Sequence, residues 1–160
     1  MEIYILVLFT CTLAGTVVGN QIHKKYKVKR VYFEQFLALI NLLISDFSFR
    51  QSKIKTLISN FEKSVGSEMK IHCNEFIKCI DGEKLTLSKL MLTPEEYTAV
   101  ENFLSALGGF DLDTQLGQLN AYKVKFNEFY LLSKEREDKY GKPSVKLGFM
   151  LGLGCGILIL

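Results

Sequence analysis

The sequence lacks the features that most enzymes and nucleic-acid-binding proteins share. It contains no glycine-rich phosphate-binding loop, no nucleophile elbow and no histidine–carboxylate metal motif. The net charge is only +3, and much of the positive charge lies in one short cluster, so no nucleic-acid footprint is indicated. These absences favour a protein with no catalytic activity and no cofactor.

Cysteine and histidine are also scarce, with four and two residues respectively. Cys11 and Cys155 lie in apolar terminal segments. Cys73 and Cys79 lie in the middle of the chain, and this distribution implies no disulfide framework. A zinc site would combine His72 with the two central cysteines, but the close cysteine pairs of structural zinc sites are missing. We expect buried thiols beside an incidental histidine, and no bound metal.

Two long segments near the ends of the chain carry no charged residue. Ile3–Gly19 and Leu147–Leu160 are uncharged apolar runs. As helices, the first with its flank to Ile22 would rise about 30 Å, the thickness of the hydrocarbon core, and the second about 21 Å. We predict an N-terminal transmembrane helix over 1–22 and a C-terminal one over 145–160. The shorter second segment would also suit a buried core helix.

The flanks of these segments predict their orientation. A cleaved signal peptide is the alternative for the first segment, but Glu2 rather than a lysine precedes it and no Ala-x-Ala site follows. Five cations follow it instead: Lys24, Lys25, Lys27, Lys29 and Arg30. By the positive-inside rule they place the middle of the chain in the cytoplasm and both ends outside, as do the lysines before the second segment. We expect the five cations to contact anionic lipid headgroups.

Small residues recur at helical spacing in both segments. They are Gly15 and Gly19 in the first and Gly148, Gly152 and Gly156 in the second. Glycine lets two helix backbones approach closely and gain dispersion contacts that lipid tails cannot match. The alternative is that glycine is simply common in transmembrane helices. We expect the two helices to pack on each other or on a partner's helices, which also allows a homo-oligomer.

Helical periodicity dominates the middle of the chain, 23–144, where strand signals are scarce. Apolar residues at three- and four-residue steps predict a long helix through Phe33–Phe47 that continues from the first apolar run. The same pattern predicts a shorter helix over Ile54–Phe61. Glu68–Leu92 is less regular, and we expect two short helices there, interrupted at Gly82.

Clear start and stop signals bound the remaining helices. Thr93-Pro94-Glu95-Glu96 combines a capping threonine, a proline at the first helical position and a capping box, and its helix should end at Gly108-Gly109. Leu112–Tyr140 predicts a long helix with a charged, solvated tail, and Gly141 and Pro143 should break it before the second membrane segment. The predicted fold is all-α, an antiparallel cytoplasmic helical bundle flanked by N- and C-terminal transmembrane helices.

Ordered motifs, mostly in the last third of the chain, carry a family resemblance. They are Leu107-Gly108-Gly109-Phe110-Asp111, then Gln115 and Leu119, then Lys139-Tyr140-Gly141-Lys142 running into Leu147-Gly148-Phe149. Asp46-Phe47-Ser48-Phe49 matches more weakly, with aspartate where glutamate is usual. In this order around two anchors, the motifs resemble the stage III sporulation protein AB family of endospore-forming Firmicutes, over roughly half of the chain.

The resemblance implies a function and partners. It implies a membrane component of the machinery that joins mother cell and forespore, with a cytoplasmic domain similar to one in platform proteins of type II secretion and type IV pili. Such a platform catalyses no reaction. It would couple a cytoplasmic secretion-type ATPase, stage III sporulation protein AA, to other membrane components of the channel complex.

Asp111, Gln115 and Asp46 are the predicted partner-contact residues of the bundle. Asp111 and Gln115 are four residues apart and share one face at the start of a helix. For Asp111 we favour a structural cap on the free amides of that helix, with the partner contact as the alternative. Gln115 could extend such a contact, be solvated, or bond within the bundle. For Asp46 the alternative is a surface carboxylate that serves only solubility.

Two other functions compete with the platform. A small oligomeric transport or pore-forming protein would line a path with its glycine-bearing helices. Against it, neither terminal segment has an ionisable residue near its centre. An enzyme acting at a lipid surface would need a pocket that the sequence does not display.

Overall fold

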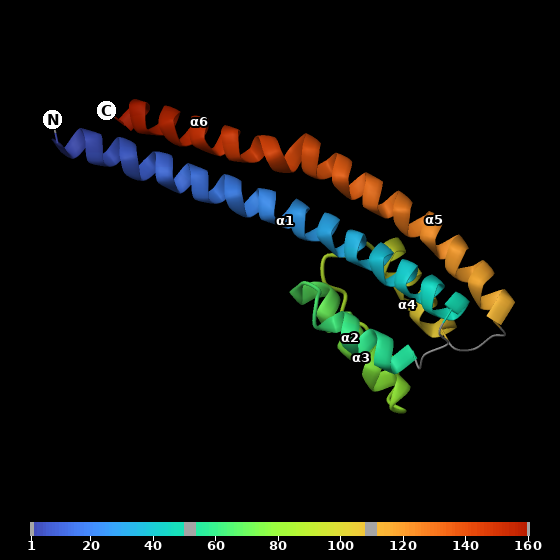
Figure 1. Cartoon of the computed structure of the whole chain (residues 1–160). Helices are drawn as coiled ribbons and strands as arrows, with labels where there is room; N and C mark the ends of the chain where they lie inside the picture. Colours follow the sequence, from blue (N-terminus) through green and yellow to red (C-terminus); the bar gives the residue numbers. More distant parts are fainter. Residues whose placement is uncertain (1, 50–53, 108–111, 160) are drawn as a thin grey trace. The chain divides into compact units, whose positions relative to one another are not determined.

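Helices make up all the regular structure in the described part of the chain (Figure 1). The computed structural model describes residues 2–49, 54–107 and 112–159. Its elements are α1 (Glu2–Phe49), α2 (Ile54–Glu62), α3 (Ser67–Ile80), α4 (Pro94–Ala106), α5 (Leu112–Arg136), the π-helical turn η1 (Glu137–Gly141) and α6 (Lys142–Ile159). No strand occurs within these three ranges, so the all-α prediction is confirmed.

The chain divides into two compact units. The hairpin unit consists of Met1–Arg30 and Leu132–Leu160, and the bundle unit of Val31–Leu131. α1 and α5 each contribute residues to both units. The long helix that was predicted to continue from the first apolar run is therefore present as α1.

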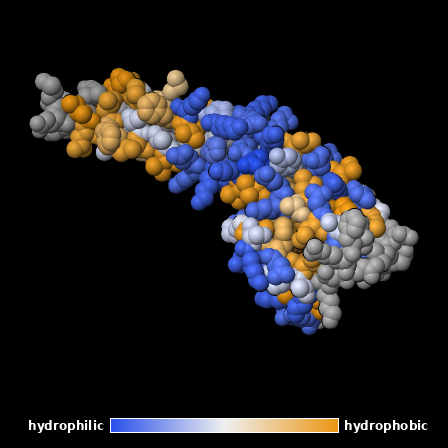
Figure 2. All heavy atoms as spheres, in the orientation of Figure 1, coloured by the Kyte–Doolittle hydropathy of each residue, from blue (hydrophilic) through white to orange (hydrophobic). Residues whose placement is uncertain are grey.

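The hairpin unit presents apolar side chains on its surface. Phe9 of α1 is 64% exposed and Leu151 of α6 is 67% exposed. Figure 2 shows apolar residues gathered over the part of this unit where α1 begins and α6 ends. Two helical stretches, Ile5–Asp46 and Thr114–Ile159, are long and apolar enough to cross a membrane, judged by length and composition.

Aromatic rings from α1, α4 and α5 form the centre of the bundle unit. The rings of Phe36 and Phe126 stack with their centroids 4.2 Å apart. Phe103 of α4 meets Phe36 at an edge, with a centroid distance of 5.1 Å. All three side chains are fully buried. Since a buried aromatic ring removes a large apolar area from water and gains further from such ring geometry, these contacts hold the three helices together.

A buried hydrogen-bond network fixes the chain between α3 and α4. His72 Nε2 lies 2.8 Å from the carbonyl oxygen of Ser88, which can only accept, so this nitrogen carries the hydrogen. Nδ1 then accepts a hydrogen bond from the Tyr32 hydroxyl at 2.6 Å. The backbone N–H of Ser88 donates to the Glu75 carboxylate at 3.0 Å. Both ring nitrogens of His72 are thereby used within the bundle.

The prediction of two short helices in Glu68–Leu92 is wrong in its second half. α3 is the only helix there, and residues 83–89 follow an irregular path. Leu87 is buried, and its carbonyl oxygen accepts a hydrogen bond from the Tyr97 hydroxyl at 3.3 Å. Side chains of α3 and α4 satisfy this backbone in place of a helical ladder, so tertiary contacts override the helix propensity of the leucines.

The predicted helix break at Gly141 and Pro143 does not occur. α5 continues through η1 into α6, and the Lys142 N–H donates to the carbonyl of Glu137, five residues earlier. Pro143 has no backbone N–H and cannot donate a helical hydrogen bond. It is the second residue of α6, where the backbone hydrogen bonds change from the five-residue spacing of the π turn to the four-residue spacing of an α-helix, so the helix continues past it. Gly141 serves close packing, because an added Cβ would lie 3.1 Å from the Cβ of Tyr26.

The capping box predicted at the start of α4 is confirmed. The Glu96 N–H donates to the Thr93 hydroxyl at 3.4 Å, and the Thr93 N–H donates to the Glu96 carboxylate at 2.7 Å. Pro94 occupies the first helical position. The predicted stop at Gly108-Gly109 lies outside the described residues.

Thr93→Ala should lower the free energy of unfolding by about 1 kcal/mol, because an N–H at the start of α4 loses its acceptor. Urea unfolding of the full chain in detergent, followed by helical circular dichroism, measures this change. Thr98→Ala is the matched control, since the Thr98 hydroxyl bonds only the Pro94 carbonyl on the exposed side of the same helix. Equal losses for the two variants would contradict the role of the cap.

Candidate functional site

The hairpin unit is built on backbone contact between α1 and α6. A Cβ added at Gly15 would lie 2.2 Å from the carbonyl oxygen of Gly148, and one added at Gly152 would lie 2.5 Å from the carbonyl oxygen of Cys11. At Gly19 the added atom would meet a carbonyl oxygen of α6 at 2.5 Å. Carbon and oxygen atoms that are not bonded stay more than 3 Å apart, so no larger residue fits without moving the helices.

The same contact extends in both directions along the two helices. At Gly156 an added Cβ would lie 3.0 Å from the Leu8 side chain. The Ser144 hydroxyl donates to the carbonyl oxygen of Gly19 at 3.0 Å. We call the five predicted glycines, Gly15, Gly19, Gly148, Gly152 and Gly156, the glycine seam. Gly154 lies outside the seam, with open space where its Cβ would be.

A buried carboxylate lies at the start of η1. Glu137 is 5% exposed, and Arg30 Nε donates to its Oε2 at 2.5 Å. His23 Nε2 lies 3.6 Å from Oε1 of the same carboxylate. Taking a carboxylate out of water costs several kcal/mol unless it is paired, and Arg30 supplies the pair. π-helical turns occur frequently at functional sites. Glu137, Arg30 and His23 are therefore candidates for fixing the position of α1 relative to η1.

The sequence prediction missed the role of Glu137. The charged tail of the long helix was expected to be solvated, but only its other charged residues are exposed. A signal for Glu137 exists in its spacing: steps of four, three and four residues lead from it through Gly141 and Ser144 to Gly148 of the seam. Residues at these steps share one helix face, so Glu137 occupies the face that packs against α1.

The five cations predicted to contact lipid headgroups lie in two environments. Lys24, Lys25 and Lys27 are exposed, whereas Lys29 and Arg30 are half-buried. Arg30 is bonded to Glu137. The structure therefore pairs the half-buried Arg30 with Glu137 and leaves the exposed lysines at the surface of the hairpin.

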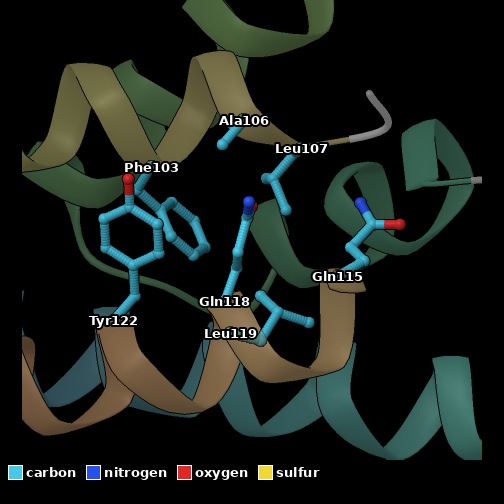
Figure 3. Close-up of a pocket in the computed structure, with 7 residues that line it drawn as sticks. All are labelled: Phe103, Ala106, Leu107, Gln115, Gln118, Leu119 and Tyr122. Carbon is cyan, nitrogen blue, oxygen red and sulfur yellow. The ribbon is translucent and has the colours of Figure 1, made fainter. Parts of the chain in front are cut away.

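In the bundle unit a small pocket lies between the end of α4 and the first turns of α5 (Figure 3). Its lining residues are Phe103, Ala106, Leu107, Gln115, Gln118, Leu119 and Tyr122. Gln115 is 8% exposed, and its amide nitrogen has no hydrogen-bond partner within the described residues. A buried amide without an acceptor costs about 1–3 kcal/mol, so an acceptor supplied by a water or a partner would be favourable.

The other two predicted contact residues differ from Gln115. Asp46 is 4% exposed, which favours a role inside the bundle over a solvated surface carboxylate. Asp111 lies outside the described residues, as do its predicted cap and any contact with Gln115. Of the predicted set, Gln115 is therefore the residue whose environment the structure both describes and leaves incomplete.

The thiol and phenol groups nearest His72 are held in their neutral forms. Burial, helped by the nearby charge of Glu62, raises the pKa of Cys73 to about 12. Burial also raises the pKa of Tyr32 well above its usual value. A neutral thiol is a poor metal ligand and a poor nucleophile. Among the described residues, no group of three histidine, cysteine, aspartate or glutamate side chains could hold a metal ion.

Gly152→Ala should destabilise the hairpin by about 1–3 kcal/mol, because the new methyl group meets the backbone of α1 and forces the helices apart. Loss of helicity of the full chain with increasing SDS in mixed micelles measures the effect. Gly154→Ala is the matched control on the same helix, and it should be neutral or slightly stabilising. A loss of similar size at Gly154, where the added methyl group meets no neighbour, would mean that close packing against α1 does not explain the effect at Gly152.

Cys73 should resist alkylation by iodoacetamide at pH 8 in the folded protein, because its raised pKa leaves almost no thiolate. The half-buried Cys79 should react faster, and both should react at similar rates after unfolding. Peptide mass mapping over a time course separates the two sites. Rapid labelling of Cys73 in the folded chain would contradict the buried, neutral thiol.

Comparison with known proteins agrees with the motifs in the last third of the chain. The family model described as stage III sporulation protein AB matches residues 3–160. No curated protein and no solved structure matches the chain. The match includes both apolar helices and every element between them. The chain therefore belongs to the stage III sporulation protein AB family.

Proposed function

We propose that the protein is a non-enzymatic membrane platform of the stage III sporulation channel complex. The observation that carries the proposal is the glycine seam, in a chain of this family. Two apolar segments far apart in the sequence meet backbone to backbone, as transmembrane helices do when small residues line their contact. This packing, in two helices with exposed apolar side chains, supports a membrane anchor, with the residues between them forming a domain outside the bilayer.

The proposed topology has two membrane segments. Residues 1–22 and 145–160 cross the membrane, and 23–144 form the cytoplasmic part. The exposed lysines directly after the first segment support this orientation, because cations are retained on the cytoplasmic side. In the family's setting the membrane would be that of the mother cell around the forespore, and the lysine cluster would contact its anionic headgroups.

The proposed partners are the ATPase stage III sporulation protein AA and other membrane components of the same complex. Gln115 supports a docking role for the bundle, because its buried amide nitrogen has no acceptor among the described residues and its side chain lines a pocket. A peptide carbonyl of a partner would satisfy that amide. Asp111 and Asp46 remain predicted contributors, Asp46 by positioning groups from inside the bundle.

The structure disfavours the pore-forming alternative at one specific point. In a pore, the small-residue faces of α1 and α6 would be available to other copies or would line a path. Here the small-residue faces of α1 and α6 contact each other within one chain, because the backbone of Gly15 packs directly against the backbone of Gly148. A homo-oligomer would have to use other faces of the hairpin.

Deletion of the gene in the source organism should abolish heat-resistant spores and arrest development after engulfment, and the intact gene should restore them. Complementation by Gln115→Ala should restore fewer spores, because the partner's carbonyl would be buried without a donor, at a cost of about 1–3 kcal/mol. Plate counts after heating measure spores, and co-purification of the ATPase from detergent extracts measures docking.

Asn120→Ala is the matched control, since Asn120 lies on α5 but its side chain bonds only the Leu116 carbonyl at the exposed surface. It should complement as well as the unchanged gene. Normal spores after deletion would overturn the sporulation function. Arrest with unchanged ATPase recovery in Gln115→Ala would retain the function and remove Gln115 from the interface.

A further inference from the structure

Lysines of the hairpin unit for which the described residues supply no carboxylate partner lie next to its exposed apolar residues. The two carboxylates within residues 137–146 are both paired inside the chain: Glu137 with Arg30, and Asp138 with Lys142 at 2.6 Å. Five exposed lysines of the hairpin unit have no carboxylate partner in the described residues. They are Lys24, Lys25 and Lys27 of α1, Lys139 of η1 and Lys146 of α6.

Two tyrosines that are sequence neighbours of these lysines join α1 and η1. The rings of Tyr26 of α1 and Tyr140 of η1 stack with their centroids 6.2 Å apart. The ammonium group of Lys139 lies 5.4 Å from the centroid of the Tyr140 ring, and that tyrosine is 52% exposed. Tyrosine in this setting offers a hydroxyl donor toward water and an apolar ring toward hydrocarbon. We call these seven residues, the five lysines with Tyr26 and Tyr140, the basic–aromatic band.

Exposed apolar side chains begin directly next to the band. Leu147 follows Lys146 and is 56% exposed, and Met150, one turn further, is 68% exposed. On α1, Ile22 and Val18 precede the lysines and are 41% and 55% exposed. A ligand that lies along this boundary would therefore meet cations and hydroxyl donors at one end and an apolar surface at the other.

We propose that the basic–aromatic band is a binding site for the phosphate group of an anionic phospholipid, assembled from both helices of the hairpin. Ammonium groups and phenol hydroxyls hold the phosphate, and the apolar side chains beyond them contact the acyl chains. The adjoining apolar surface is what selects a lipid over a soluble phosphate. The inference rests on the proposed membrane anchoring and deepens it.

This site differs from the one that the charge cluster of α1 alone predicts. Arg30 is excluded, because its guanidinium is bonded to the buried Glu137. Lys139, Tyr140 and Lys146 are added, and they lie more than 100 positions further along the chain. The π turn brings Gly141 against Tyr26, which sets Tyr140 beside it, so lipid selectivity depends on residues of η1 and α6 as much as on the N-terminal cluster.

The test uses the full chain in micelles of a neutral detergent, titrated with phosphatidylglycerol or phosphatidylcholine, with retained lipids counted by native mass spectrometry. The double variant Lys139→Gln with Lys146→Gln should weaken phosphatidylglycerol binding by at least about five-fold, since each lysine near an anionic surface contributes about that factor. Phosphatidylcholine binding should not change.

The matched control is Lys123→Gln with Lys125→Gln. It removes two exposed lysines of α5, one of which also lies over an aromatic ring, at 5.9 Å from the centroid of Phe129. This variant should bind phosphatidylglycerol as the unchanged chain does. Equal weakening in both double variants, or in neither, would overturn the site. Displacement of the lipid by millimolar inorganic phosphate would overturn the choice of a lipid ligand.

A second measurement separates this inference from the proposed function. Extraction of cell membranes with alkaline carbonate tests whether the chain is an integral membrane protein. Release of the chain by carbonate would overturn the membrane platform and the lipid site together. Retention of the chain, with no preference for phosphatidylglycerol, would overturn the lipid site alone. Circular dichroism of both double variants checks that each remains folded.

Discussion

The pairing of α1 with the last helical stretch of the chain is the interaction on which the rest of the structure depends. In the bundle unit the pairing is made by aromatic rings, with Phe36 of α1 stacked on Phe126 of α5. In the hairpin unit it is made by backbone, with Gly15 against Gly148. Large aromatic rings stabilise a contact by leaving water. Glycine stabilises a contact in another way, because it lets two helix backbones approach closely and gain dispersion contacts.

The π turn lies where these two kinds of contact meet in the sequence. It adds a residue to one turn of the helix, and it places Glu137 and Gly141 toward α1. The Arg30–Glu137 pair is a poor source of net stability, because taking the Glu137 carboxylate out of water costs about as much as its attraction to the half-buried Arg30 returns. Its value lies in specificity: sliding the helices past each other would leave a buried carboxylate without its partner.

The polar groups of the bundle unit divide into satisfied and unsatisfied ones. His72 bonds on both sides, to Tyr32 and to the backbone of Ser88, and so acts as a structural cross-link between α1, α3 and the segment before α4. Gln115 is buried with an amide nitrogen that bonds nothing in the described residues. A fully satisfied network gives a unique core, while an incomplete one marks the place where another molecule can contribute.

Local patterns predicted much of this protein correctly. The apolar period predicted α1 and α2, and the Thr93–Glu96 capping box placed the start of α4 at Pro94, because a cap depends on four consecutive residues. The ordered motifs led to the family that the full-length match then showed. Predictions failed where distant residues decide the backbone: Leu85 and Leu87 have the composition of a helix but lie in an irregular segment held by α3 and α4.

By itself the sequence determined the helical class, the two apolar ends and the glycine positions, since these follow from composition and from the 3.6-residue period. Only the tertiary structure decided what each polar residue does. It paired Arg30 with the buried Glu137, continued the helix past Pro143, and set Tyr140 beside Tyr26. The reason is physical. The spacing of apolar residues is a property of one helix. The pairing of a charge and the position of a π turn depend instead on which residues of the neighbouring helix lie opposite, here Arg30 and Tyr26 of α1.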